Sequence, residues 1–361
     1  MEYQSDLSFD EVRELLYSSE PMKRVIGARK AMAFENAFVP RLRELLDDVF
    51  YEVRAYAAKS LGKLEVYDAI PKITPLLFDE VEEVRYSSAE ALGHFRDGQV
   101  ILPLLRTLSD HSRETRRLAT LSLKAQDEVH LRQVIFAWLD QLVPSDYDMM
   151  DEDAIQRIDV SRGIMEACGV FGFTWVDEIL RRGLHSPDLE MQRLAAISIG
   201  QLQLDQFSEE LLDRRAEEDD DVRMGLIYGL SQLDFPDKLD VLRQYCDDSF
   251  EFIRQLLASE LPRQYPPDLI SDEVNNFLED DLALVRASLA QNLREESYLD
   301  HLTELLEDPY DYVRKEAAIS LGMVSHPRSL EALQETEETD DLVIIAIDNS
   351  ISDLKKSLPL Q

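Results

Sequence analysis

The chain has 361 residues, and a single hydrophobic core rarely grows beyond about 250 to 300 residues, so we expect several domains or one repeat array. Hydrophobic residues make up 45% of the chain and charged residues 31%, which excludes a disordered or fibrous protein. Asp and Glu number 73 against 38 Lys and Arg, for a net charge of -35. Such a surface repels phosphate backbones and anionic lipid, so we expect neither nucleic acid nor membrane as a partner.

A short sequence pattern recurs along the chain. Val-Arg-x-x-Ala-Ala-x-x-Leu-Gly at residues 53–62 returns at 84–93, with Ser for the first Ala, and unchanged at 313–322. With the arginine as position 0, apolar residues fall at positions -1, +3, +4 and +7, which form one stripe of a helix. Position 0 recurs about every 31 residues, at Arg24, Arg54, Arg85, Arg116, Ser161, Gln192, Arg223, Arg254, Arg286, Arg314 and Ile344.

In chain order, each unit is predicted to hold a first helix, a turn with an acid six residues before position 0, and a second helix. Four units fill residues 1–143 and seven fill residues 155–361. The interval between Arg116 and Ser161 is about 14 residues longer than the others, so we predict an acidic inserted loop at 144–154. The fold prediction is therefore all-α, an α-solenoid superhelix of about eleven stacked helix pairs.

The repeated acid and arginine have a structural interpretation. An acid in the turn can accept hydrogen bonds from free N–H groups of the next helix and can reach the arginine of a neighbouring unit. We expect such a ladder through these residues: Asp48, Arg54, Asp79, Arg85, Asp110, Arg116, Asp308 and Arg314. The glycine at position +8 is predicted to end the second helix in the left-handed conformation.

Positions +1 and +5 of the second helices are predicted to face an inner, concave groove. They bring together a cationic and aromatic strip, for which we select the following residues: Tyr86, Glu90, Arg117, Arg162, Glu166, Arg193 and Tyr228. Aromatic anchors and Arg–carboxylate pairs would bind a partner there. The alternative is that these residues only populate exposed helix positions. In the inserted loop, Tyr147, Met149 and Met150 form a second candidate docking element, the alternative being a solvated linker.

Common catalytic motifs are missing from the sequence. It has no Gly-rich phosphate loop, no Gly-x-Ser-x-Gly and no His-Glu-x-x-His, and its six histidines are scattered. Two distant cysteines, Cys168 and Cys246, suit neither a disulfide framework nor a zinc site. We therefore expect no catalytic residue, no metal and no cofactor. With no apolar leader or long apolar stretch in the sequence, a cytoplasmic location is expected.

The repeat resembles the short HEAT-like repeats named after the phycocyanobilin lyases, most closely at residues 48–62, 79–93 and 308–322. Deoxyhypusine hydroxylases of similar architecture need His-Glu dipeptides, which this sequence lacks. The leading prediction is a non-catalytic scaffold or adaptor that binds a protein with a basic surface along its concave face. The alternative implied by the resemblance is a bilin lyase subunit or phycobiliprotein chaperone, in which the arginines would pair with bilin propionates.

Overall fold

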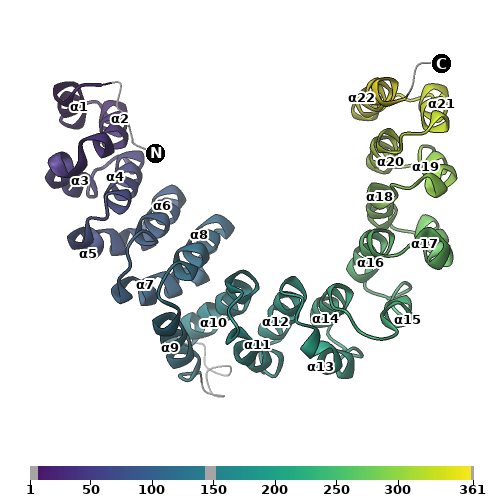
Figure 1. Cartoon of the computed structure of the whole chain (residues 1–361), viewed down its shortest axis with the longest axis horizontal. Coiled ribbons are helices and arrows are strands. Elements are labelled where there is room, and N and C mark those ends of the chain that lie inside the picture. The colour runs from purple at the N-terminus through teal and green to yellow at the C-terminus, as the bar shows by residue number, and fades with distance from the viewer. Residues whose placement is uncertain (1–6, 143–151, 359–361) are drawn as a thin grey trace. The chain divides into compact units, whose positions relative to one another are not determined.

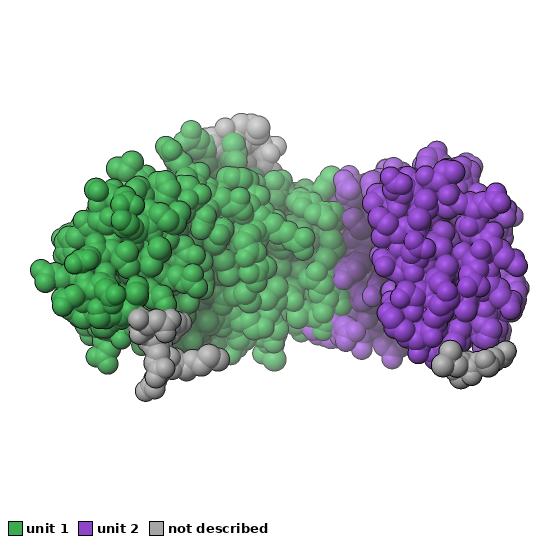
Figure 2. Space-filling model, turned by 90° about the horizontal axis from the view of Figure 1, so that it is seen from above, with its two compact units in different colours: residues 1–202 green, residues 203–361 purple. Residues whose placement is uncertain are grey.

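The computed structural model describes residues 7–142 and 152–358. These residues form eleven pairs of helices joined by turns and short 3₁₀ helices, and they contain no strand. The predicted all-α fold of stacked helix pairs is confirmed (Figure 1). The chain divides into two compact units, residues 1–202 and residues 203–361, which Figure 2 colours separately.

In residues 1–202, six first helices form one row and six second helices form another (Figure 1). The first helices are α1 (Phe9–Leu16), α3 (Val39–Leu45), α5 (Ile70–Ile73), α7 (Ile101–Arg106), α9 (Glu128–Leu139) and α11 (Val176–Leu184). The second helices are α2 (Pro21–Ala31), α4 (Tyr51–Lys63), α6 (Glu82–Leu92), α8 (Arg113–Lys124), α10 (Glu152–Phe171) and α12 (Leu189–Gln201).

Residues 203–361 repeat this arrangement in five pairs (Figure 1). The first helices are α13 (Ser208–Asp213), α15 (Lys238–Arg243), α17 (Ser271–Leu278), α19 (Leu299–Leu305) and α21 (Pro327–Glu335). The second helices are α14 (Asp220–Gln232), α16 (Glu251–Gln264), α18 (Ala283–Asn292), α20 (Asp311–Met323) and α22 (Asp341–Ser357). In both halves of the chain, the recurring apolar side chains of the repeat pattern are buried between the row of first helices and the row of second helices.

The glycine at position +8 has a different role from the predicted one. Gly62 lies inside α4, and among the described glycines only Gly172 has a positive φ. The prediction that the glycine at position +8 ends the helix in the left-handed conformation is therefore wrong. A Cβ atom on Gly62 would lie 2.6 Å from the carbonyl oxygen of Ala91 in α6. The position is kept free of a side chain because neighbouring second helices approach each other closely there.

A serine at position +6 also joins neighbouring second helices. The Ser60 hydroxyl donates to the backbone oxygen of Ala28 at 2.8 Å, and Ser122 donates to Ala89 at the same distance. The equivalent bonds in later repeats are Ser198 to Met165 and Ser320 to Ala290, at 2.7 Å each. Each of these serines is buried, and the bond to the neighbouring helix satisfies its hydroxyl group.

The long interval before Ser161 is partly helix. Helix α10 begins at Glu152, nine residues before position 0, whereas α4 begins only three residues before its own. Residues 152–154, predicted as the end of the loop, therefore open this helix instead. Residues 143–151, with Tyr147, Met149 and Met150, lie outside the described residues, and the division of the chain at 144–154 stays a prediction.

Candidate protein-binding face

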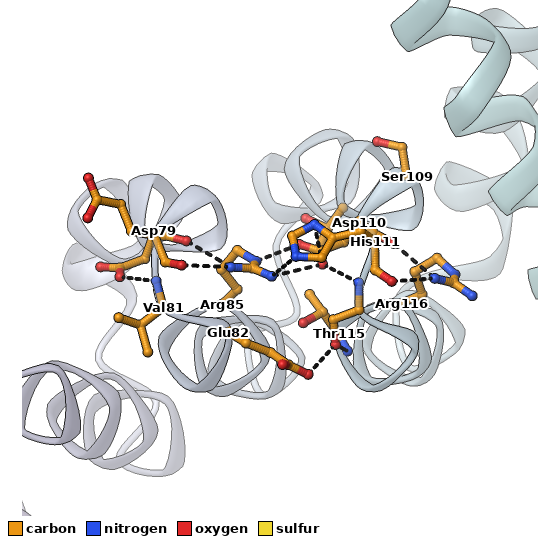
Figure 3. Close-up of polar contacts among 12 residues, drawn as sticks. Asp79, Val81, Glu82, Arg85, Ser109, Asp110, His111, Thr115 and Arg116 are labelled. Atoms are coloured by element: carbon orange, nitrogen blue, oxygen red, sulfur yellow. Dashed lines mark hydrogen bonds and ion pairs between the residues drawn. The ribbon is translucent and has the colours of Figure 1, made fainter.

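An arginine and an acid connect successive repeats. The Nε atom of Arg85 donates to Asp110 Oδ2 at 2.7 Å, and its Nη2 atom donates to Oδ1 at 3.2 Å (Figure 3). The Nη1 atom donates to the backbone oxygen of Asp79 at 3.1 Å, six residues before it in the same repeat. Asp110 Oδ1 also accepts from the N–H group of Ser112, the N-cap residue directly before α8. One arginine thus fixes the turn of its own repeat and that of the next.

The same two-point pairing recurs with both side chains largely buried. The pairs are Arg24–Asp48, Arg54–Asp79, Arg85–Asp110, Arg223–Asp248, Arg254–Asp280, Arg286–Asp308 and Arg314–Glu338. The attraction within such a buried ion pair is opposed by the cost of removing both charges from water, whereas removal of one partner leaves a buried charge uncompensated. We call this set the arginine ladder.

The ladder changes partners around the interruption of the repeat. Arg116 pairs with Glu166 at 2.9 Å. Ser161 at position 0 has no guanidinium, and its neighbour Arg162 holds both carboxylate oxygens of Asp188 instead, at 3.1 and 2.6 Å. Two residues predicted to contact a partner, Arg162 and Glu166, therefore already make contacts between repeats.

Glu338 is the last acid of the arginine ladder, and its carboxyl group has a lowered pKa. Hydrogen bonds from Arg314 lower the pKa of this carboxyl from 4.5 to about 2. Because the folded-state pKa lies below the unfolded value, the pair stabilises the protein fully above about pH 4.5. That contribution is lost as the pH falls from about 4.5 towards about 2.

We therefore expect Glu338→Gln to lower stability at neutral pH and to flatten its decline below about pH 4.5. Urea denaturation at a series of pH values measures both effects. Glu337→Gln removes an exposed neighbouring charge and serves as the control. The same slope in Glu338→Gln and in the unchanged protein would contradict this origin of the acid sensitivity.

We define the second-helix face as the side chains at positions -2, +1 and +5 of the second helices. All seven residues of the predicted strip are exposed or half-buried. In residues 1–202, Arg162, Glu166 and Arg193 line one hollow of about 410 Å³. Arg117 lies outside it and forms a two-point pair with Glu114 of its own helix, at 2.7 Å.

Tyr86 and Glu90 form a separate part of the same face. The Nζ atom of Lys59 lies 5.3 Å from the centre of the Tyr86 ring and 3.2 Å from Glu90 Oε2. This contact shows how the face holds an ammonium group, by the ring and a carboxylate together. Burial and the carboxylates of Glu83 and Glu114 raise the pKa of Tyr86.

Tyr228 belongs to the second unit. It lines a hollow of about 680 Å³ together with Lys238, Glu260 and Arg263. Burial lowers the pKa of Lys238, while nearby carboxylates oppose that shift. Of the seven predicted residues, Arg162, Glu166 and Arg193 share one hollow. Tyr86 and Glu90 lie beside Lys59, and the Glu114 partner of Arg117 acts on Tyr86. Tyr228 lines the hollow in residues 203–361.

Sequence reasoning missed a row of acids at position -2. In residues 1–202 the row comprises Glu52, Glu83, Glu114, Asp159 and Glu190. Three of these acids pair with an arginine at +1 of the same helix, at Arg117, Arg162 and Arg193. In the second and third repeats position +1 is Ala55 or Tyr86, so those acids lack such an arginine. The sequence itself indicates this row, because position -2 is acidic in five successive repeats of residues 1–202.

The described residues contain no group of three or more His, Cys, Asp or Glu side chains arranged to hold a metal ion. Both cysteines are buried, and burial raises the pKa of each thiol. Over the described ranges, no helix combines the length and the apolar character needed to cross a membrane.

The family model for HEAT repeats matches residues 39–124 and 271–350, so these two regions are similar to HEAT repeats. They include the three segments with the strongest sequence pattern. Residues between them follow the same helix-pair arrangement with a weaker pattern. The assignment to the phycocyanobilin-lyase type stays a prediction. None of the curated proteins matches the sequence significantly.

Solved structures of the karyopherin Kap121p are similar in fold. The structure of Kap121p alone has a TM-score of 0.55 at 12% identity, over 99% of this chain and 46% of that one. Kap121p bound to RanGTP gives 0.51 at 12% identity, over 98% and 46%. Kap121p bound to the SUMO protease Ulp1p gives 0.50 at 13% identity, over 98% and 45%. This chain therefore spans less than half the length of these proteins, and at such identity the likeness concerns the fold alone.

Proposed function

We propose that this protein is a non-catalytic scaffold that binds a basic segment of a partner protein on its second-helix face. The observation that supports this most is the row of five acids at position -2 in residues 1–202. A segment rich in Lys and Arg that lies along the row would meet a carboxylate on each successive helix. The same charge would repel anionic competitors.

The second and third repeats are the strongest part of the proposed surface. Glu83 lies there near Tyr86, and neither Glu52 nor Glu83 has an i,i+3 arginine, so an incoming cation displaces no such pair. The contact of Lys59 with Tyr86 and Glu90 illustrates the chemistry that a partner lysine would use.

The similar karyopherin structures bind proteins, RanGTP in one and Ulp1p in another, so a helix-pair array can serve as a protein-binding surface. The alternative, a bilin lyase subunit, has no specific observation in its favour. Arg117, Arg162 and Arg193 each hold a carboxylate of this chain, which bilin propionates would have to displace.

Reversing three acids of the row tests the proposal. We expect Glu52→Lys, Glu83→Lys and Glu114→Lys together to weaken binding of a short Lys/Arg-rich peptide at least tenfold, measured by titration calorimetry at several salt concentrations. The control reverses Glu14, Glu44 and Asp68, which lie on the side of the first helices and change the net charge equally. Equal loss in both variants would show that only net charge matters and would overturn a site on this face.

A further inference from the structure

The second-helix face changes character in residues 203–361. Position -2, acidic in the second to seventh repeats, is apolar or aromatic in the last four, at Phe252, Leu284, Tyr312 and Leu342. Phe252, Leu284 and Leu342 are 48%, 54% and 65% exposed, well beyond what packing within the unit requires. Tyr312 is half-buried. We call these four residues the apolar stripe.

The stripe runs across adjacent helices of one unit. Helices α16, α18, α20 and α22 pack side by side in chain order (Figure 1). A residue at the same register position on each therefore lies next to its equivalents. At the α20–α22 end the stripe widens into a hollow of about 420 Å³, lined mainly by Ile319, Met323, Leu342, Ile345 and Ala346. Exposed apolar side chains that line up across neighbouring helices and end in an apolar hollow mark an interaction site.

Charge defines what could cover the stripe. Residues 203–361 carry 38 Asp and Glu against 14 Lys and Arg, whereas residues 1–202 carry 35 against 24. Glu251, Asp311 and Asp341 directly precede stripe residues, and Asp353 stands at the edge of the hollow. Lys315 also lines the hollow but is paired with Glu316 at 3.2 Å. A complementary partner is apolar along one line and basic on its flanks.

The spacing of the stripe selects a helix as the binding form. Packed helices lie about 8 to 10 Å apart, and seven residues of an α-helix rise about 10.5 Å and return to the same side. An extended strand repeats its side every 6.6 to 6.8 Å or so, which misses this spacing. A polyproline helix repeats about every 9.3 Å and favours grooves lined by aromatic rings. Phe252 and Tyr312 of the stripe are aromatic, but the hollow at its α20–α22 end is lined mainly by Leu, Ile, Ala and Met, and the proline peptide described below distinguishes the two forms.

We infer that the apolar stripe docks an amphipathic α-helix of a partner protein, with an apolar residue about every seventh position and Lys or Arg on both flanks. The inference concerns a second site and does not depend on the acidic row of residues 1–202. Four repeats at this spacing correspond to a helix of about 20 residues.

The test uses the full chain and a labelled peptide of about 21 residues with Leu in heptad spacing and Lys elsewhere. We expect it to bind with a gain of helical circular dichroism. Phe252→Ser, Leu284→Ser and Leu342→Ser together should weaken binding at least tenfold, because they remove exposed apolar side chains without adding a carboxylate that peptide lysines could pair with. The control, Leu269→Ser, alters another exposed leucine of residues 203–361, on the short helix η8 (Pro267–Leu269), and should change affinity less than twofold.

Two further peptides separate shape from charge. A scrambled peptide of equal composition should bind at least tenfold more weakly, and so should one with two central prolines. Equal binding of the scrambled peptide, or unchanged binding in the variant at Phe252, Leu284 and Leu342, would overturn the inference. Neither result would bear on the proposed role of the acidic row. Equal binding of the proline peptide would overturn the helical form. Each titration is repeated in the Glu52, Glu83 and Glu114 reversal, which removes the acidic row as a competing site for the peptide lysines. Loss of binding by the stripe variant in that background concerns the apolar stripe alone, so the two proposals fail independently.

Discussion

Replacing Arg85 with alanine is expected to lower the free energy of unfolding of residues 1–202 by about 3 kcal/mol or more. The side chains of Arg85 and Asp110 are 7% and 9% exposed. The substitution leaves the Asp110 carboxylate in this site without its two-point partner. It also removes the donor to the backbone oxygens of Asp79 and Glu80. An uncompensated buried charge costs far more than the pair contributes.

Arg117→Ala is the matched control, because it removes an arginine of the neighbouring repeat from an exposed pair with Glu114. There we expect less than about 1 kcal/mol. Repeat arrays can unfold in parts, so hydrogen exchange of the α6 and α8 amides is the suitable measurement. A double variant, Arg85→Met with Asp110→Leu, should regain much of the loss. Similar effects of Arg85→Ala and Arg117→Ala would refute a buried ladder.

The regular part of this ladder could be predicted because it depends on local register. An acid six residues before position 0 and an arginine at position 0 recur in most repeats, and Arg54, Arg85 and Arg314 pair with the acid of the next repeat. Where the length changes, the register no longer identifies the partner. Position 0 is then Ser161, and the neighbouring Arg162 makes the contact with the next repeat instead, while Arg116 pairs with Glu166. A pattern of spacing cannot show which neighbouring residue takes over a contact.

The binding face was harder to predict, for a related reason. Exposed positions were selected by residue type, which favoured Arg and Tyr, yet Arg117 and Arg193 are held by acids of their own helices. Those acids stand three residues earlier, and pairs at i,i+3 are common on any helix. Comparison of one register position across all repeats is more informative. It reveals both the acidic row and the change to apolar residues at Phe252.

Close contact between second helices depends on small residues. The substitution Gly62→Ala tests this, because the two possible causes predict opposite signs for the change in the free energy of unfolding. Helix propensity alone would favour alanine by about 1 kcal/mol. The added Cβ atom would lie 2.6 Å from the oxygen and 2.7 Å from the Cα atom of Ala91, both backbone atoms that only a separation of α4 and α6 can relieve. Overpacking costs about 1 to 3 kcal/mol, so we expect a net loss for alanine and about 3 kcal/mol or more for Gly62→Val.

Gly98→Ala separates this effect from the general cost of replacing a glycine. The three atoms nearest to its added Cβ atom all belong to the exposed side chain of His130, which can swing aside, so we expect little change in stability. Urea denaturation followed by hydrogen exchange in α4 and α6 compares the variants. If Gly62→Ala stabilised the protein, the glycine would act through helix propensity alone. A loss would instead mean that position +8 sets the distance between second helices, and hence the spacing at which the second-helix face presents its acidic and apolar side chains.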